Sequence, residues 1–258
     1  MVPEALRGKR WLVLTGAGVS TDSGIPDYRS PGAPARRPMT YQEFIASEAN
    51  RQRYWARAHL GWASMRWAEP NATHRWLAER QDRFVGLITQ NVDRLHVRAG
   101  HRQVVELHGR LDQVVCIDCG IHSDRIPFHR RLDELNPGWT DREVQILPDG
   151  DVELEGTEGF VVAPCEYCGG RIKTDVVFFG ESVDKATVRH SFDLTDAAHA
   201  LLVLGSSLTV MSGLRFVRHA AKQGIPVVIV NRGETRADDL ATIKIDAGVA
   251  QTLATWDI

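Results

Sequence analysis

Short runs of mostly apolar residues recur along the chain and alternate with stretches in which apolar and polar residues mix. The runs predict buried strands at residues 11–14, 84–89, 104–107, 174–181, 201–204 and 227–230. The mixed stretches predict helices at residues 48–67, 72–80, 184–197 and 210–223, and a helix that begins at a capping box of Thr40 and Glu43. Strands that alternate with helices predict a parallel sheet with right-handed crossovers. The expected fold class is therefore α/β, a doubly wound, Rossmann-like domain.

Large apolar residues gather on the predicted helix at residues 48–67, namely Tyr54, Trp55, Leu60, Trp62 and Met65. Their spacing favours a buried core or a domain interface over a ligand-binding face. The segment at residues 30–38 contains three prolines and predicts a loop. A plain connector and a lid that closes over a ligand are equal alternatives for this loop.

Composition narrows the class of protein. A chain of 258 residues with 43% hydrophobic and 25% charged residues is typical of a soluble globular protein. The formal net charge of -2 argues against a nucleic-acid-binding surface, and the apolar runs are too short to span a membrane. Because the first residues show no signal-peptide pattern, we expect a cytoplasmic protein.

All four cysteines fall in two C-x-x-C pairs, Cys116 with Cys119 and Cys165 with Cys168. Two such pairs supply four thiolates for a tetrahedral Zn²⁺ ion and leave no open coordination position, so the predicted metal is structural. A redox-active dithiol and inert buried cysteines are the alternatives.

The predicted organisation is one domain over residues 1–258 with two insertions. The zinc-binding module occupies about residues 113–173, where the composition becomes polar with proline and glycine, and a helical insert occupies about 40–81. The remaining segments form the large Rossmann-like part, at about 1–39, 82–112 and 174–258.

A glycine-rich turn follows the first predicted strand. Gly16 and Gly18 have no Cβ atom, which lets the backbone and the N-terminus of a following helix approach a pyrophosphate. The third glycine of the usual dinucleotide-binding motif is absent, because Thr21 stands in its place. On these residues alone, an ordinary strand-to-helix turn is an equal alternative.

Polar groups also follow the other predicted strands. Residues 90–93 follow the second strand, His108 follows the third, and Gly205-Ser206-Ser207 and Asn231-Arg232-Gly233 follow the last two. Ligands of open α/β sheets bind at the carboxyl ends of the strands, so these groups are candidate ligand-binding residues. The alternatives are a polar helix cap for residues 90–93 and a structural role for His108, which is one of ten histidines.

The residues after the glycine turn extend it into a longer motif, Gly24-Ile25-Pro26-Asp27-Tyr28-Arg29. The stretch at residues 15–29 resembles the cofactor loop of the sirtuins, the NAD-consuming protein-lysine deacylases, which reads GAG-x-S-x(3)-GIPD-[FY]-R. Residues 89–93 match the sirtuin TQN-[IV]-D motif, and His108 with Gly109 matches the HG motif. The resemblance covers residues 11–253 and places a zinc module at the same point of the chain.

The resemblance implies NAD as the co-substrate and one structural Zn²⁺ ion as a cofactor. It implies that His108 is the general base acting on a hydroxyl of the nicotinamide ribose, with Asn91 as a second catalytic residue, and that residues 246–249 close over the adenine. The implied cofactor-binding residues are Gly16, Ala17, Gly18, Ser20, Ile25, Pro26, Asp27, Tyr28, Arg29, Gln90, Asn91, Val92, Asp93, Gly205, Ser206, Ser207, Asn231, Gly233 and Val249.

The implied reaction removes an acyl group from a protein lysine. The acyl oxygen attacks C1′ of the nicotinamide ribose, and His108 assists collapse of the resulting imidate to nicotinamide, free lysine and O-acyl-ADP-ribose. Transfer of ADP-ribose to a protein is the alternative activity, and a dehydrogenase or a non-catalytic NAD-binding module is less favoured.

The implied partner is an acyl-lysine protein or peptide. The protein is expected to be a monomer that binds neither nucleic acid nor a membrane. The implied substrate-binding residues are Val177, Phe178, Phe179, Gly180 and Glu181, which pair with the peptide by β-augmentation, together with Tyr54 and Arg57. Details at residues 53–57, 61–62, 148–151 and 205–208, with Ser212 and Gly213, resemble class II sirtuins. In class III sirtuins a matching Tyr-x-x-Arg reads acidic acyl groups, and a scaffold role for Arg57 is the equal alternative. This sequence departs from the usual sirtuin pattern in the loop after the strand at residues 201–204, because sirtuins more often have Thr at Ser206 and Pro near Ser212.

Overall fold

A parallel sheet of six strands forms the centre of the larger lobe of this computed structural model, which describes residues 1–27, 38–142, 152, 154 and 156–257. Its strand order is β3-β2-β1-β7-β8-β9, so the chain leaves β1 in one direction and continues from β7 in the other. The strands are β1 (Trp11–Thr15), β2 (Phe84–Thr89), β3 (Val104–Glu106), β7 (Ala200–Leu204), β8 (Val227–Val230) and β9 (Ile243–Ile245). Reversal of the strand order between β1 and β7 produces the crevice in which such folds bind ligands.

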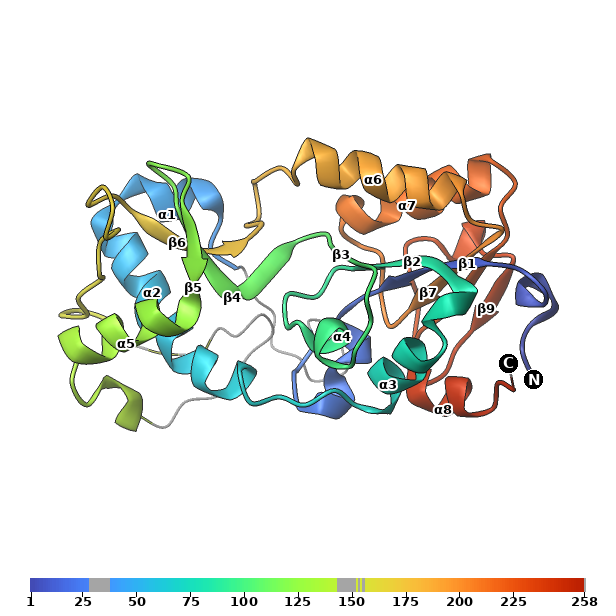
Figure 1. Ribbon diagram of the computed structural model, residues 1–258, viewed down its shortest axis with the longest axis horizontal. Coiled ribbons are helices and arrows are strands. Elements are labelled where there is room, and N and C mark those ends of the chain that lie inside the picture. Colours follow the sequence, from blue (N-terminus) through green and yellow to red (C-terminus); the bar gives the residue numbers. More distant parts are fainter. Residues whose placement is uncertain (28–37, 143–151, 153, 155, 258) are drawn as a thin grey trace.

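Helices cover both faces of this sheet (Figure 1). Helices α6 (Lys185–Asp196) and α7 (Met211–Lys222) pack on one face, and α3 (Ala72–Glu79), α4 (Leu95–Arg98) and α8 (Val249–Ala254) lie on the other. Side chains of β1 alternate between the two cores, because Trp11 and Val13 pack with Leu77 of α3 whereas Leu12 and Leu14 pack with Phe216 of α7. The confirmed fold class is thus α/β and Rossmann-like.

The smaller lobe combines a three-stranded antiparallel sheet with three helices. The sheet has the order β5-β4-β6, from β5 (His122–Asp124), β4 (Gly109–Cys116) and β6 (Ile172–Val176). The helices are α1 (Tyr41–Ala46), α2 (Glu48–Met65) and α5 (Arg125–Leu135). Phe44, Trp55 and Phe128 bring these helices into one buried core, and this confirms the predicted core role of the aromatic residues on α2.

Short 3₁₀ turns complete the secondary structure of the described residues. They are η1 (Glu4–Leu6), η2 (Ala17–Val19), η3 (Thr21–Ser23), η4 (Gln81–Arg83), η5 (Trp139–Asp141) and η7 (Asp238–Leu240). None of the described helices is long and apolar enough to cross a membrane.

Two sequence-based predictions of local structure are wrong. The glycine turn after β1 leads into η2 and η3 rather than into an α-helix, so no helix N-terminus faces the turn. The strand predicted at residues 174–181 begins at Ile172 and ends at Val176, and it belongs to the small sheet. Its neighbour β4 pairs with it only around residues 109 and 114–116, and the continuation from Val177 is held instead by the His108 carbonyl.

Candidate functional site

A cavity of about 1520 Å³ opens at the carboxyl edge of the large sheet and extends to α2 and to the segment after β6. It is larger than the roughly 300–1,000 Å³ of ordinary small-molecule pockets, so it has room for more than one bound group. Every described residue that was predicted to bind cofactor or substrate lines it, and so does His108. Tyr28 and Arg29, the loop at 30–37 and the stretch at 148–151 lie outside the described residues.

The glycine turn packs closely against the loop after β7. A Cβ atom on Gly16 would lie 2.7 Å from the Ser206 Cβ atom, and one on Gly18 would lie 2.9 Å from the Gly205 carbonyl oxygen. The Gly18 amide donates to that same carbonyl oxygen at 2.9 Å. Gly205 has a φ of +58°, and a side chain there would meet Gly18 at 2.7 Å. The glycines therefore let two strand-end loops meet at the floor of the cavity.

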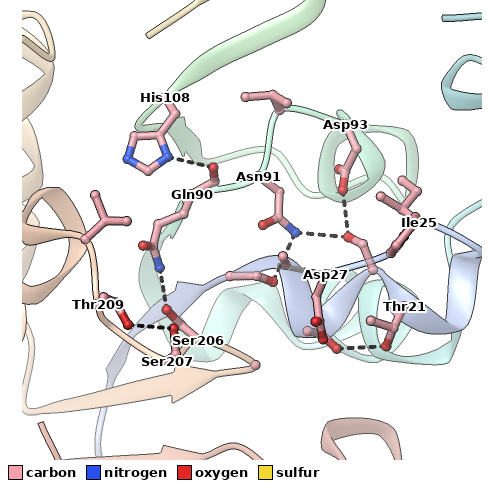
Figure 2. A pocket seen from close by; sticks show the side chains of 18 of the residues that line it. Thr21, Ile25, Asp27, Gln90, Asn91, Asp93, His108, Ser206, Ser207 and Thr209 are labelled. Carbon is pink, nitrogen blue, oxygen red and sulfur yellow. Dashed lines mark hydrogen bonds between the residues drawn. The ribbon is translucent and has the colours of Figure 1, made fainter. Parts of the chain in front are cut away.

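Asn91, Ser20 and Asp93 form a buried hydrogen-bond network beside this floor (Figure 2). The Asn91 Nδ2 atom donates to Ser20 Oγ at 3.0 Å and to the Gly16 carbonyl oxygen at 3.1 Å. Ser20 Oγ donates to Asp93 Oδ2 at 2.6 Å, and the Leu95 amide donates to Asp93 Oδ1 at 2.9 Å. Burial raises the pKa of Asp93, and these hydrogen bonds to its carboxylate act in the opposite direction. The network fixes the Asn91 and Asp93 side chains before any ligand binds.

His108 is held by a hydrogen bond at each ring nitrogen. Its Nδ1 atom lies 2.9 Å from the Gln90 carbonyl oxygen, and its Nε2 atom lies 2.7 Å from the Ser212 Oγ atom. A carbonyl oxygen only accepts, so Nδ1 carries the proton and Nε2 accepts from the Ser212 hydroxyl. Burial lowers the pKa of His108, the Arg215 charge also lowers it, and the Gln90 carbonyl opposes both. The ring is therefore neutral near pH 7, with its basic nitrogen on Nε2.

Gln90 connects this histidine to the loop after β7. Its side-chain Nε2 atom donates to Ser206 Oγ at 2.8 Å and lies 3.3 Å from the Thr15 carbonyl oxygen (Figure 2). A Cβ atom on Gly213 would lie 2.7 Å from the Gln90 Oε1 atom, so a glycine next to Ser212 leaves the space that Gln90 occupies. Hydrogen bonds of the Gln90 side chain thus join the carboxyl ends of β1, β2 and β7.

The remaining residues that were predicted to bind the cofactor line the cavity near the ends of β8 and β9. Asn231 and Gly233 follow β8, and Val249 begins α8. The Gly233 amide donates to Asp246 Oδ1 at 2.9 Å, which ties the loop after β8 to the loop after β9. Residues 247–251 line the cavity at this end.

Residues 177–181 form the wall of the cavity next to the smaller lobe. The Val177 amide donates to the His108 carbonyl oxygen at 2.8 Å, and the Tyr41 amide donates to the Phe179 carbonyl oxygen at 2.9 Å. Phe178 is buried against Phe44 and Tyr54, whereas the side chain of Phe179 is 47% exposed. The segment turns at Gly180, where the Glu181 amide donates to the Phe178 carbonyl oxygen at 3.0 Å, and its first residue is hydrogen-bonded directly to the residue that carries the basic imidazole.

Tyr54 and Arg57 reach the same cavity from α2. The Tyr54 hydroxyl shares a hydrogen bond with Thr174 Oγ1, and Arg57 Nε donates to the Val152 carbonyl oxygen at 2.9 Å. They lie one helical turn apart on one side of α2, as their spacing predicts.

The four cysteines come together at the outer end of the small sheet. The Cys116 and Cys168 Sγ atoms lie 3.6 Å apart, those of Cys119 and Cys165 lie 3.9 Å apart, and all four are within 4.8 Å of one another. Sulfurs of a tetrahedral zinc site with Zn–S bonds of about 2.3 Å lie about 3.8 Å apart, whereas a disulfide needs about 2.05 Å. The Gly170 amide also points at Cys168 Sγ at 3.3 Å. The donor set therefore fits a structural zinc ion.

Sequence reasoning missed the contact between Ser212 and His108. Ser212 was noted only as a departure from the usual sirtuin pattern, where proline is common nearby. A serine near the start of a helix is by itself only a weak indication that it contacts a histidine of the site. Residues 104 positions apart become neighbours only once the strand order is known.

Comparison with known proteins agrees with this site. Residues 16–212 match the model of the Sir2 family. The chain is 54% identical, over 98% of its own length and 87% of the relative's, to "NAD-dependent protein deacetylase 1" of Streptomyces coelicolor. A solved structure titled "Sir2-p53 peptide-NAD+" superposes with a TM-score of 0.78 at 31% identity, covering 97% of this chain and 93% of the other. A Sir2 complex with the inhibitor EX-527, 2'-O-acetyl-ADP-ribose and deacetylated p53 peptide gives 0.77 at 30% identity, over 97% and 94%.

Proposed function

The chain belongs to the Sir2 family, and from this premise we propose how its cavity performs NAD-dependent deacylation. The protein is an NAD-dependent protein deacetylase of the sirtuin type. In the overall reaction the amide bond of the acyl-lysine breaks, nicotinamide leaves NAD, and the acyl group ends on a ribose oxygen of ADP-ribose. One water molecule balances the equation, and free lysine is the remaining product.

The strand-end loops around the glycine turn are proposed to hold NAD. Gly16 to Gly18 and Ser206 with Ser207 supply backbone and hydroxyl groups at the cavity floor, where the phosphates would be held without a nearby side chain in the way. Asn231 and the residues at 247–251 line the opposite end, which suits the adenosine. No helix N-terminus faces the glycine turn, and the Gly16 and Gly18 amides already donate to the Leu204 and Gly205 carbonyl oxygens. The Ala17 amide, with the hydroxyl groups after β7, would therefore bind the phosphates.

His108 is proposed as the general base, and its fixed orientation is the observation that carries the mechanism. The Gln90 carbonyl keeps the proton on Nδ1, so Nε2 is free to accept a proton once a ribose hydroxyl replaces the Ser212 hydroxyl. The lowered pKa keeps this nitrogen unprotonated near pH 7. Transfer of the ribose hydroxyl proton to Nε2 makes the ribose oxygen nucleophilic toward the acyl carbon.

Asn91 and Asp93 are proposed to bind the nicotinamide end of NAD. Their mutual network through Ser20 orients both side chains toward the cavity at the carboxyl end of β2. An amide and a carboxyl group complement the carboxamide of nicotinamide and the neighbouring ribose hydroxyls. Because both side chains are already ordered, binding of NAD would cost less side-chain conformational entropy.

The acyl-lysine peptide is proposed to lie along residues 177–181. This segment lines the cavity and begins at the backbone of His108, so a lysine side chain entering beside it reaches the basic nitrogen. The exposed Phe179 ring offers apolar surface to the peptide. A monomeric state without nucleic-acid partners and a cytoplasmic location remain predictions.

Arg57 is proposed to favour acyl groups that end in a carboxylate. Arg57 and Tyr54 line the cavity together on α2, and a guanidinium matches a carboxylate with two parallel hydrogen bonds. A panel of matched peptides with acetyl-, succinyl-, glutaryl- and longer acyl-lysine, each assayed with NAD, tests this preference. Higher kcat/KM on the acidic acyl groups is the expected result, and a preference for acetyl-lysine would contradict it.

A further inference from the structure

Three side chains of the smaller lobe form a second cluster of potential metal ligands. His59 lies on α2, and His129 and Asp133 lie one turn apart on α5. The Nε2 atom of His59 is 3.0 Å from Asp133 Oδ1, and that of His129 is 3.9 Å from Asp133 Oδ2. One ligand atom from each residue lies within 4.8 Å of the other two. None of the three residues is part of the cavity lining.

Both histidines are buried, and their ring nitrogens are poorly satisfied. His59 is 0% exposed, and neither of its ring nitrogens has a hydrogen-bond partner among the described residues. Its only short polar contact among the described residues is the one from Nε2 to Asp133, and Nδ1 has none. The His129 Nδ1 atom is likewise buried without a partner in the described part of the chain. Buried polar atoms are nearly always bonded, so an unpartnered one calls for an explanation such as a bound ion.

Charges of both signs surround the cluster. Asp133 supplies one negative charge, and two arginines lie near the histidines. The positive Arg125 nearby already donates to the Leu111 and Ala58 carbonyl oxygens and lies over the Trp62 ring. Arg66 is a second positive charge near His129.

We propose that His59, His129 and Asp133 bind a divalent first-row transition-metal ion, with Zn²⁺ expected, which joins α2 to α5. Two imidazoles and one carboxylate suit zinc, cobalt and nickel, whereas magnesium and calcium prefer oxygen ligands alone. Ligand atoms of a tetrahedral site lie about 3.4 Å apart. The three donor atoms here lie within 4.8 Å of one another and the two ring centroids lie 4.0 Å apart, so small side-chain shifts would accompany binding. Asp133 is 46% exposed, which gives the ion a path from solvent and leaves a position for water. This inference is independent of the proposed function.

Cobalt titration of the protein with its cysteine-bound zinc in place tests the proposal. We expect one additional Co²⁺ per chain, with visible d–d absorption but without the thiolate charge-transfer band of a cysteine site. Asp133→Asn should weaken this binding at least roughly tenfold, since even groups outside the first coordination shell contribute 10–100-fold. Glu134→Gln changes the neighbouring exposed carboxylate on the same helix and should bind cobalt like the wild type.

Thermal unfolding supplies a second readout. Cobalt should raise the Tm of the wild type and of Glu134→Gln but not that of Asp133→Asn, because a ligand stabilises only the state that binds it. No cobalt uptake beyond the cysteine site would overturn the proposal and leave His59 and Asp133 as an ordinary buried contact. Equal uptake by the wild type and Asp133→Asn would overturn it as well.

Discussion

The Nε2 atom of His108 lies 2.7 Å from the Oγ atom of Ser212, near the start of helix α7. This hydroxyl donates to the lone pair that acts as the base in the proposed mechanism, so it holds the ring in place and stabilises its neutral form. A ribose hydroxyl of bound NAD would take over the same position. Ser212 is therefore a positioning residue for the base in the unliganded cavity.

Because a ribose hydroxyl replaces Ser212 once NAD binds, Ser212→Ala should act on the free enzyme and lower kcat/KM for NAD about two- to tenfold, since one hydrogen bond contributes roughly 0.5–1.5 kcal/mol. The kcat value should change little. Loss of a donor to the neutral ring raises the pKa of His108 in the free enzyme, so the acid limb of the kcat/KM profile should move to higher pH. Ser212→Thr keeps the hydroxyl and should keep the wild-type profile. A Ser212→Ala enzyme with wild-type kcat/KM and an unshifted acid limb would contradict this role.

His108→Ala should abolish deacylation while NAD binding stays within a few fold, since a general base contributes about 10²–10⁴ in rate. In the wild type the lowered pKa of His108 keeps the base neutral below pH 6.5, so the activity should persist there and fall only at more acidic pH. Steady-state rates between pH 5 and 8 and calorimetric NAD titration measure both. His190→Ala, at an exposed histidine on α6, should behave like the wild type.

Cys165→Ser should lose the zinc ion and much of the folding stability together, because binding of structural zinc is itself folding free energy. Elemental analysis and thermal unfolding check the two effects on the same sample. Tyr167 lies between the second pair of cysteines and is 74% exposed, so the control variant Tyr167→Ala should keep both the zinc ion and the wild-type Tm. Active wild-type protein without zinc would refute the structural role.

Arg57→Met should erase a preference for acidic acyl groups and spare deacetylation. A charge-assisted hydrogen bond contributes about 1.5–3 kcal/mol, which corresponds to roughly ten- to a hundredfold in kcat/KM. Arg53→Met, an exposed arginine one turn earlier on α2, is the matched control. Equal losses on acetyl and succinyl peptides would place Arg57 in the scaffold, where its contact with the Val152 carbonyl oxygen already contributes.

Four of the strands that the sequence predicted well are buried on both faces, and the fifth, β3, is partly buried. The four, β1, β2, β7 and β8, are mostly apolar because helices cover both sides of the central sheet. β4, β5 and β9 are partly exposed and lack such a run, so the sequence analysis missed them. Helix α8 has only six residues, which is too short for a helical period to show.

The site was predictable in its residue types but not in its internal contacts. The glycines of the turn were expected to approach a ligand, and the structure shows that they first make room for the loop after β7. The hydrogen bond between Gln90 and Ser206 joins residues 116 positions apart, and that partnership depends on strand order rather than on local pattern. The same is true of His59 and Asp133, which no motif connects.

The central claim is NAD-dependent deacetylation, and quantifying nicotinamide, acetylated ADP-ribose and freed lysine from one reaction tests it most directly. The protein is incubated with an acetyl-lysine peptide and NAD, and the products are quantified by mass spectrometry. The account predicts one nicotinamide and one ADP-ribose carrying the acetyl group for each lysine freed, with no NADH absorbance. Free acetate with intact NAD, or ADP-ribose attached to the peptide, or NADH without nicotinamide, would contradict it.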